Sequence, residues 1–210
     1  MVAPTTDVPE HEGALTFQRV VLLGPPGAGK STLARTLQAC SGLPLHHLDF
    51  LFFGPGWIPT PRPIWRARQE KLVQEQSWII DGNYASTLEL RLARADLAIF
   101  LDFPRLRTTL RVLKRVLWTY GRVRPDLAPG CPERLDPAFL AFTWTWPERE
   151  RPQTVEELSR YAREGGKICR LTGPRTVVGF VRLAQHLAVR APDPALRVPL
   201  RLLTTGWPAP

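Results

Sequence analysis

The chain has 210 residues, 44% of them hydrophobic, and a formal net charge of +9 at pH 7. This length is typical of one globular domain that needs no disulfide or structural metal for stability. The three cysteines lie far apart and show neither a disulfide pattern nor metal-ligand spacing. The excess of basic residues favours an anionic partner such as a nucleotide, nucleic acid or acidic lipid, although a general bias toward arginine would give the same count.

The two ends of the chain are polar or rich in proline. Residues 1–15 lack the apolar segment of a secretion signal, and no run of about 18 apolar residues predicts a membrane span. We therefore expect a soluble, cytoplasmic protein, with a monomer as the default. Residues 1–15 and 191–210 are predicted to be flexible tails on either side of one domain over residues 16–190.

Short apolar runs alternate with helical patterns along this domain. Residues 18–23 form an apolar run that predicts a buried strand, and residues 30–40 have the spacing of a helix. Five such alternations predict a three-layer α/β/α fold with a five-stranded parallel sheet. The other predicted strands are residues 45–49, 77–81, 98–103 and 167–172, and the other predicted helices are residues 61–76, 104–120, 153–164 and 174–189.

Residues 121–151 interrupt the alternation with prolines, glycines and tryptophans. We predict that they form a helical lid insertion, which would close over a bound substrate and exclude water. Trp144 and Trp146 lie within this segment, where packing of the lid is favoured over contact with a ligand. Arg151, at its far end, is a candidate for contact with phosphate from the lid.

The clearest motif follows the first predicted strand. The sequence GPPGAGKS at residues 24–31 fits the GxxxxGK[ST] pattern of nucleotide-binding loops. Its glycines let backbone amides approach phosphate oxygens, and the following helix adds its positive N-terminal end. Lys30 is predicted to reach the β- and γ-phosphates and to act in catalysis, and Ser31 is predicted to bind Mg²⁺. ATP and Mg²⁺ are thus the expected ligands, and the predicted nucleotide-binding residues here are Gly24, Pro25, Gly27, Ala28, Gly29, Lys30, Ser31 and Thr32.

Three carboxylates lie at or near the carboxyl ends of predicted strands: Asp49, Asp81 and Asp102. Ligands of parallel sheets bind beyond these strand ends, so the three side chains are expected near the nucleotide-binding loop. Structural alternatives remain open, namely an Asp-Gly turn for Asp81 and a loop acid or helix cap for Asp49. For Asp102 the structural role, such as capping the next helix, is favoured.

Between the second and third predicted strands lie aromatic and cationic residues: Trp57, Arg62, Trp65 and Arg66. An aromatic ring beside an arginine can hold a base or a sugar, so this segment is a candidate acceptor site. Ordinary packing of a helix on the sheet is the alternative.

The sequence resembles the nucleoside monophosphate kinase-like group of P-loop NTPases. GPPGAGKST is similar to the adenylate kinase loop, and IIDGNY at residues 79–84 is similar to the D-G-F-P-R of that family. The resemblance is closer to an adenylate kinase-related branch called DNA topology modulation proteins, through HHLD, PGW, SWIIDGNY, FLDFPR and RPDLAPGCPERLD. It covers about residues 18–185. Asn83 and Tyr84 replace the Phe-Pro-Arg whose arginine binds the AMP phosphate, which argues against AMP as the acceptor.

This resemblance implies roles for individual residues. Asp81 corresponds to a carboxylate that orders Mg²⁺-bound water, and Asp49 to an acid that orients or deprotonates the acceptor. Arg111 and Arg115 lie one helical turn apart and correspond to arginines that stabilise the transferring phosphoryl group. A solvated basic helix face is the alternative for this pair. Arg175 corresponds to a residue that contacts the adenine ring.

Two functions are compatible with these motifs. One is a kinase that transfers the γ-phosphate of Mg-ATP to a small acceptor, such as a nucleoside, a nucleotide or a sugar-like molecule. The other is an ATP-binding regulator associated with DNA, as the name of the branch suggests. The sequence contains no helix-turn-helix, zinc finger or other DNA-reading element, so the kinase is favoured and nucleic acid is the weaker partner.

Overall fold

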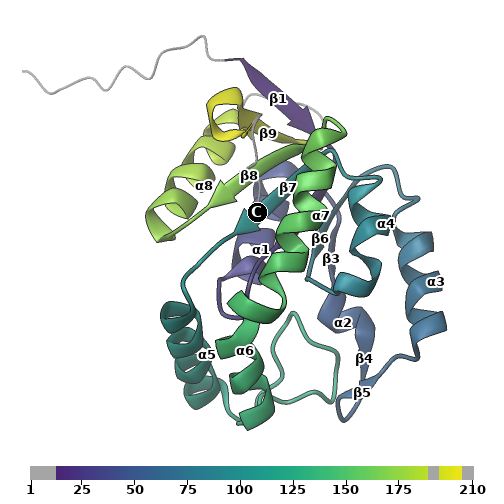
Figure 1. Cartoon of the computed structure of the whole chain (residues 1–210), viewed down its shortest axis with the longest axis vertical. Helices are drawn as coiled ribbons and strands as arrows, with labels where there is room; N and C mark the ends of the chain where they lie inside the picture. The colour runs from purple at the N-terminus through teal and green to yellow at the C-terminus, as the bar shows by residue number, and fades with distance from the viewer. Residues whose placement is uncertain (1–12, 189–193, 205–210) are drawn as a thin grey trace, which may run out of the picture.

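A computed structural model describes residues 13–188 and 194–204 of the chain. Its centre is a parallel sheet in the order β3-β6-β2-β7-β8, and Figure 1 shows this sheet between layers of helices. Because helices cover both faces, the predicted three-layer α/β/α P-loop fold with a five-stranded parallel sheet is confirmed. The strands are β2 (Arg19–Leu23), β3 (Leu45–His47), β6 (Trp78–Asp81), β7 (Leu97–Leu101) and β8 (Lys167–Leu171).

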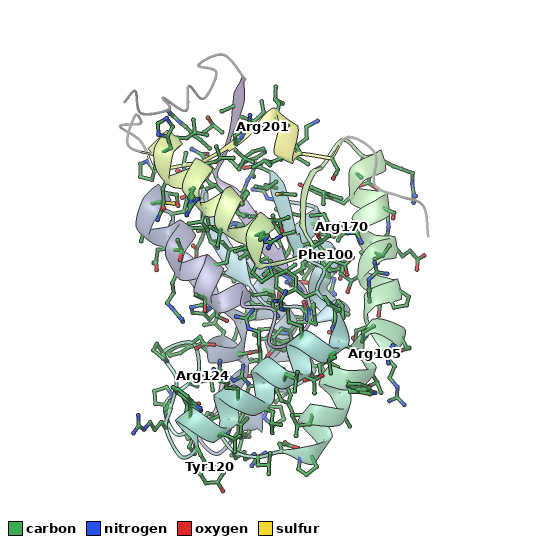
Figure 2. The ribbon with its side chains drawn as sticks, turned by 90° about the vertical axis from the view of Figure 1, so that its left-hand side faces the viewer. Phe100, Arg105, Tyr120, Arg124, Arg170 and Arg201 are labelled. Carbon is green, nitrogen blue, oxygen red and sulfur yellow. The ribbon has the colours of Figure 1, made fainter. Side chains whose placement is uncertain are left out.

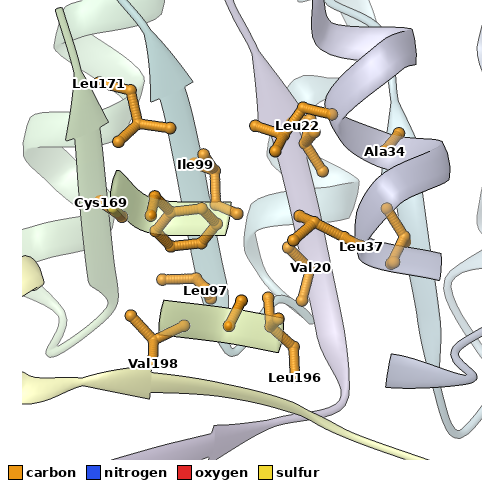
Figure 3. Packing of buried hydrophobic residues seen from close by; sticks show 14 of the residues in the cluster. Val20, Leu22, Ala34, Leu37, Leu97, Ile99, Cys169, Leu171, Leu196 and Val198 are labelled. Carbon is orange, nitrogen blue, oxygen red and sulfur yellow. The ribbon is translucent and has the colours of Figure 1, made fainter. Parts of the chain in front are cut away.

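Alternate residues of the central strand β2 point into two separate cores. Val20 and Leu22 lie in the core of one face, which Figure 3 shows, and Val21 and Leu23 lie in the core of the other. Helices α1 and α8 cover the first face, whereas α3, α4 and α7 cover the second. The helices are α1 (Lys30–Ser41), α3 (Arg62–Leu72), α4 (Leu88–Leu92), α7 (Arg151–Arg163) and α8 (Pro174–Ala188).

Both ends of the domain differ from expectation. Strand β1 (Ala14–Phe17) pairs antiparallel with β9 (Leu196–Pro199), and a 3₁₀ turn (Leu200–Leu202) follows. Leu196 and Val198 are buried in the first core, which explains why this proline-containing segment is ordered. The expectation of flexible tails is therefore wrong for residues 13–15 and 194–204. The remaining tail residues, 1–12, 191–193 and 205–210, lie outside the described residues.

The segment after β3 also corrects the predicted elements. The strand ends at His47, and a short helix α2 (Leu48–Phe52) begins, so Asp49 lies in the first turn of a helix. Strands β4 (Phe53–Gly54) and β5 (Ile58–Pro59) then form a hairpin that the sequence pattern did not predict. Strands of two residues are too short to show a hydrophobic period.

The predicted lid segment, residues 121–151, consists of a loop followed by a helix. Helix α6 (Pro137–Arg149) begins after Asp136, whose side chain accepts hydrogen bonds from the amides of Ala138 and Phe139. α6 lies against α5 (Arg105–Thr119), and Trp146 is buried beside Phe100, as expected of a packing residue. Trp144 is instead 45% exposed, with the Arg105 guanidinium over its ring.

The loop before α6 is fastened to the β4–β5 hairpin. The Gly56 amide donates to the Gly130 carbonyl at 2.8 Å, and Trp57 Nε1 donates to the Pro132 carbonyl at 3.0 Å. The Cys131 thiol lies 3.1 Å from the Gly54 carbonyl oxygen. We call residues 53–59 and 121–136 together the clasp.

Among the helices of the described residues, none has the length and apolar character that a membrane span requires.

Candidate nucleotide-binding and transfer site

A cavity of about 900 Å³ opens at the carboxyl edge of the sheet, between the phosphate loop (residues 24–31) and the clasp. Register explains how distant residues meet there, because Asp81 at the end of β6 lies opposite both Leu22 and His47. The predicted site residues that line this cavity are Gly27, Gly29, Lys30, Ser31, Thr32, Asp49, Asp81, Arg111 and Arg115. Gly24, Pro25 and Ala28 are buried within the loop itself.

The phosphate loop forms the tight turn that its glycines predict. Gly27 has a φ of 77°, and a Cβ there would lie 2.4 Å from the Thr108 carbonyl oxygen, so the loop backbone rests directly on α5. Helix α1 starts at Lys30, and no side chain of the described residues caps it. The first amides of a helix have no partner within the helix, which leaves a positive N-terminal end facing the cavity.

The Lys30 side chain folds back onto the start of the phosphate loop. Its Nζ donates to the carbonyls of Gly24 at 2.8 Å and Pro25 at 3.0 Å. Burial lowers the pKa of Lys30, and the nearby Asp81 and Asp49 oppose this shift. The ammonium group is thus placed at the loop, and within the part of the chain that the structure describes it has no direct carboxylate partner.

The two arginines predicted for phosphoryl transfer lie in different surroundings. Arg111 Nη1 donates to the Ala28 carbonyl at 3.3 Å, and its guanidinium lies beside Gly29. Arg115 Nη2 instead donates to Glu133 Oε1 at 3.1 Å. Burial and the neighbouring Arg124 lower the pKa of Arg115, while Glu133 opposes that change.

Glu133 is the centre of a buried ion network in the clasp. Its second carboxylate oxygen lies 2.7 Å from Arg124 Nε, and Arg124 Nη1 donates to Asp126 at 2.8 Å. The side chains of Glu133 and Asp126 are both 6% exposed. Figure 2 shows Arg124 beside the end of α5, where the chain leaves that helix near Tyr120. Sequence reasoning missed this network, although both acids stand in the RPDLAPGCPERLD stretch.

Asp81 has one free carboxylate oxygen. Its Oδ2 lies 2.9 Å from His47 Nδ1, whereas its buried Oδ1 has no hydrogen-bond partner among the described residues. Carboxylate, hydroxyl and water oxygens are the ligands that Mg²⁺ prefers, so Asp81 and Ser31 fit a nucleotide-bound Mg²⁺. No cluster of three or more His, Cys, Asp or Glu side chains that could hold a metal by itself occurs in the described part of the chain. The residues present therefore suit a metal held largely by phosphate and water.

Asp49 occupies the acceptor side of the cavity. Its Oδ1 accepts a hydrogen bond from the Tyr84 hydroxyl at 2.7 Å. Desolvation raises the pKa of Asp49, the hydrogen bond from Tyr84 partly opposes this, and the charge of Asp81 adds to it. The Tyr84 ring is held in turn against Phe52 and Trp65, with ring centroids 4.9 Å away in both cases. A carboxylate with a raised pKa in such a place is suited to accept a proton.

Several candidates from the sequence lie elsewhere. Arg175 is exposed in the first turn of α8 and is not among the residues lining the cavity. Trp65 is buried in the second core, and Arg66 pairs with Glu70 and Glu89 on the surface, so helix packing explains α3. Trp57 alone of that group lines the cavity.

Asp102 is a structural anchor, but it does not cap the helix that follows it. Arg151 and Arg170 each bind its carboxylate through two nitrogens, at distances from 2.5 to 3.0 Å. Burial opposes ionisation, but the hydrogen bonds from the two arginines outweigh it and lower the pKa of Asp102. Arg151 is thus held at the start of α7 by Asp102, and it is not among the residues lining the cavity.

Comparisons with known proteins leave the family open. No family model matches the sequence, and no curated protein matches it. Among solved structures, a shikimate kinase from Bacteroides thetaiotaomicron is similar to 81% of this chain and 98% of its own, with 16% identity and a TM-score of 0.48. A similarity this distant carries no conclusion about activity. The fold assignment rests on the sheet order and the phosphate loop of the chain itself.

Proposed function

We propose that this protein is an ATP-dependent phosphotransferase that transfers the γ-phosphate of Mg-ATP to a hydroxyl group of a small acceptor. One observation carries the proposal: Lys30 at the phosphate loop and Asp49 on the acceptor side open into the same cavity. Bound Mg-ATP would supply the phosphoryl group and the metal charge. A nucleoside, a nucleotide other than AMP or a sugar-like alcohol are the acceptor types that we consider.

The residues of the chain divide the work of such a transfer. The loop amides, Lys30 and Arg111 would hold the phosphates and stabilise the charge on the transferring group. Asp81 and Ser31 would hold the metal through water and a hydroxyl oxygen. Asp49 would accept the proton of the attacking hydroxyl as the new O–P bond forms and the bond to the ADP oxygen breaks. Tyr84 orients that carboxylate through its hydrogen bond.

The experiment is an acceptor screen with Mg-ATP, coupled to release of ADP. We expect one class of acceptor to raise ADP release above the basal rate. In the same assay Lys30→Ala should weaken Mg-ATP binding by roughly a hundredfold, because it removes a charged donor to phosphate. Asp49→Asn should keep Mg-ATP binding and lose about 10²–10⁴ of the acceptor-dependent rate. Normal turnover in Lys30→Ala would contradict the loop assignment, and unchanged turnover in Asp49→Asn would place Asp49 outside the chemistry.

The alternative function, a DNA-associated regulator, can be distinguished from the kinase by assays on the same protein preparation. It requires Mg-ATP binding without acceptor-dependent ADP release, together with DNA binding that weakens steeply as salt rises from about 50 to 200 mM. Acceptor-dependent turnover with little DNA binding at about 200 mM salt supports the kinase.

A further inference from the structure

We propose that Asn83 is a positioning residue that fixes the entry of the phosphate loop through both backbone groups of Gly24, and that the buried Arg91 holds Asn83 in place. The inference rests on the proposed function, because it assigns Asn83 a part in nucleotide binding. It concerns a residue that the sequence marked only as a departure from the adenylate kinase pattern. Asn83 is also the only asparagine among the 210 residues.

The side-chain amide of Asn83 matches the backbone of Gly24 on both sides. Its Oδ1 accepts from the Gly24 amide at 3.0 Å, and its Nδ2 donates to the Gly24 carbonyl at 2.8 Å. A backbone N–H can only donate and a carbonyl can only accept, so the orientation of the Asn83 amide is determined by these partners. Aspartate, leucine or alanine would lose one or both bonds.

Gly24 is confined on its other side as well. It has a φ of 139°, and a Cβ at this position would lie 2.4 Å from the Leu101 carbonyl oxygen. The glycine is therefore enclosed between β7 and Asn83, at the residue where β2 turns into the phosphate loop. Movement of Asn83 would move the start of the loop.

The Gly24 carbonyl that Asn83 contacts is also a partner of Lys30. The Gly24 carbonyl accepts from both Asn83 Nδ2 and Lys30 Nζ, each at 2.8 Å. A carbonyl oxygen has two lone pairs, so both donors can be accommodated. Asn83 thus sets the position of an oxygen against which the catalytic ammonium group rests.

Arg91 holds the backbone on which Asn83 stands. Its side chain is fully buried, and it donates to the carbonyls of Gly82 at 2.6 Å, Tyr84 at 3.0 Å and Asn83 between them. Burial lowers the pKa of Arg91 to about 9, so the guanidinium stays charged at neutral pH. Three consecutive carbonyls compensate that buried charge, and any change in their path would cost free energy.

This arrangement links the two sides of the cavity. Tyr84 has a φ of 41°, which is unusual for a residue other than glycine, and its hydroxyl binds Asp49. Residues 82–84 therefore contact the phosphate loop through Asn83 and the acceptor-side carboxylate through Tyr84. Arg91 holds the backbone of the three residues that make these two contacts.

The test compares two substitutions of Asn83 and asks whether their effect depends on Lys30. A carboxylate at position 83 keeps an acceptor for the Gly24 amide but faces the Gly24 carbonyl with a second acceptor, and alanine loses both bonds. If Asn83 acts on the nucleotide through the carbonyl oxygen on which Lys30 rests, removing Lys30 should remove much of the effect of either substitution.

The measurement is the Kd for Mg-ATP of the full chain near neutral pH, expressed as the ratio to the parent protein, in the unaltered background and in a Lys30→Ala background. In the unaltered background Asn83→Asp and Asn83→Ala should each bind about tenfold more weakly. In the Lys30→Ala background each should weaken binding by less than about threefold, because the group that Asn83 positions is gone. Gln38→Glu, on the exposed side of α1, adds the same charge and should leave the ratio near one.

Folding is measured in parallel, so that a damaged variant remains informative. Denaturant unfolding of each variant gives the fraction that is folded under the titration conditions, and Kd is calculated for that fraction. Equal weakening with and without Lys30, or normal binding by both Asn83 variants, would overturn the inference and leave the proposed function intact. Failure of the unaltered protein to bind Mg-ATP would overturn both.

Discussion

The two walls of the cavity both carry cations, but these cations have different partners. On the phosphate-loop wall, Lys30 and Arg111 donate to backbone carbonyls. On the clasp wall, Arg115 and Arg124 pair with Glu133, and Arg124 also pairs with Asp126. A carbonyl accepts hydrogen bonds from a cation but carries no net charge, whereas a carboxylate neutralises the cation. The first wall is therefore suited to attract a triphosphate, and the second is held together by its own charges.

The difference shows that the number of basic residues says little about where an anion binds. Arg111 and Arg115 lie one turn apart on α5 and have the same chemistry, yet only Arg111 contacts the phosphate loop. What separates them is Glu133, which comes from a loop 18 positions after Arg115. The partners of a cation, which only the fold reveals, decide its role.

The largest effect is expected for Glu133→Gln, which tests whether the clasp wall is held together by its own ion pairs. The substitution leaves Arg115 and Arg124 facing each other with their shared carboxylate removed, which should destabilise the fold by about 3 kcal/mol. Affinity for Mg-ATP in the folded fraction should change little, since Lys30 and Arg111 are untouched. Denaturant unfolding and Mg-ATP titration measure the two effects.

A matched control for Glu133 is Glu157, whose side chain is 20% exposed. Glu157 pairs with Arg160 one turn away, and that arginine is 51% exposed. Glu157→Gln should change the free energy of unfolding by less than about 0.5 kcal/mol. If Glu133→Gln is no more harmful than this control, the clasp network does not hold the second wall together.

The second prediction sharpens the contrast within α5. Arg111→Ala should weaken Mg-ATP binding about tenfold and leave the unfolding free energy nearly unchanged, because the guanidinium is exposed and pairs only with a carbonyl. Arg115→Ala should change Mg-ATP affinity by no more than about twofold while lowering stability and phosphoryl transfer. Equal effects of the two variants on Mg-ATP affinity would remove the distinction between the walls.

Much of the fold follows from local patterns in the sequence. The apolar runs around Val20, Ile80 and Ile99 predict the central parallel strands because these strands are buried on both faces. The β4–β5 hairpin and the pairing of β1 with β9 were missed, since short edge strands depend on partners far away in the chain. Leu196 and Val198 show the alternation of apolar residues that is typical of a strand, but the surrounding prolines indicated a flexible tail.

The candidate site was likewise predictable only in part from the sequence. Lys30 and Ser31, predicted from the local spacing of the phosphate-loop motif, and Asp81, at the end of β6, all line the cavity. Their roles in binding and catalysis stay predictions. Asn83 could not be assigned, because its partner Gly24 lies 59 positions away. Arg175 was assigned by resemblance alone, and the structure leaves it outside the cavity lining. Its contact with an adenine ring stays a prediction.

The smallest effect concerns a cation–carboxylate cluster outside the cavity, where the pairing rule of the clasp should also hold. Asp102 joins the end of β7 to Arg151 on α7 and Arg170 on β8, and its side chain is 8% exposed. Its folded pKa is lowered, so the ion pairs stabilise the protein above the unfolded pKa of about 3.9 and lose their effect as pH falls through the folded pKa. Because both arginines are about one-third exposed, we expect a contribution of only about 1 kcal/mol. The difference in unfolding free energy between the unaltered protein and Asp102→Asn should therefore be constant from pH 5 to 7 and shrink below about pH 4. A difference that stays constant into acid would mean that Asp102 acts through its shape and hydrogen bonds, with no net contribution from its charge.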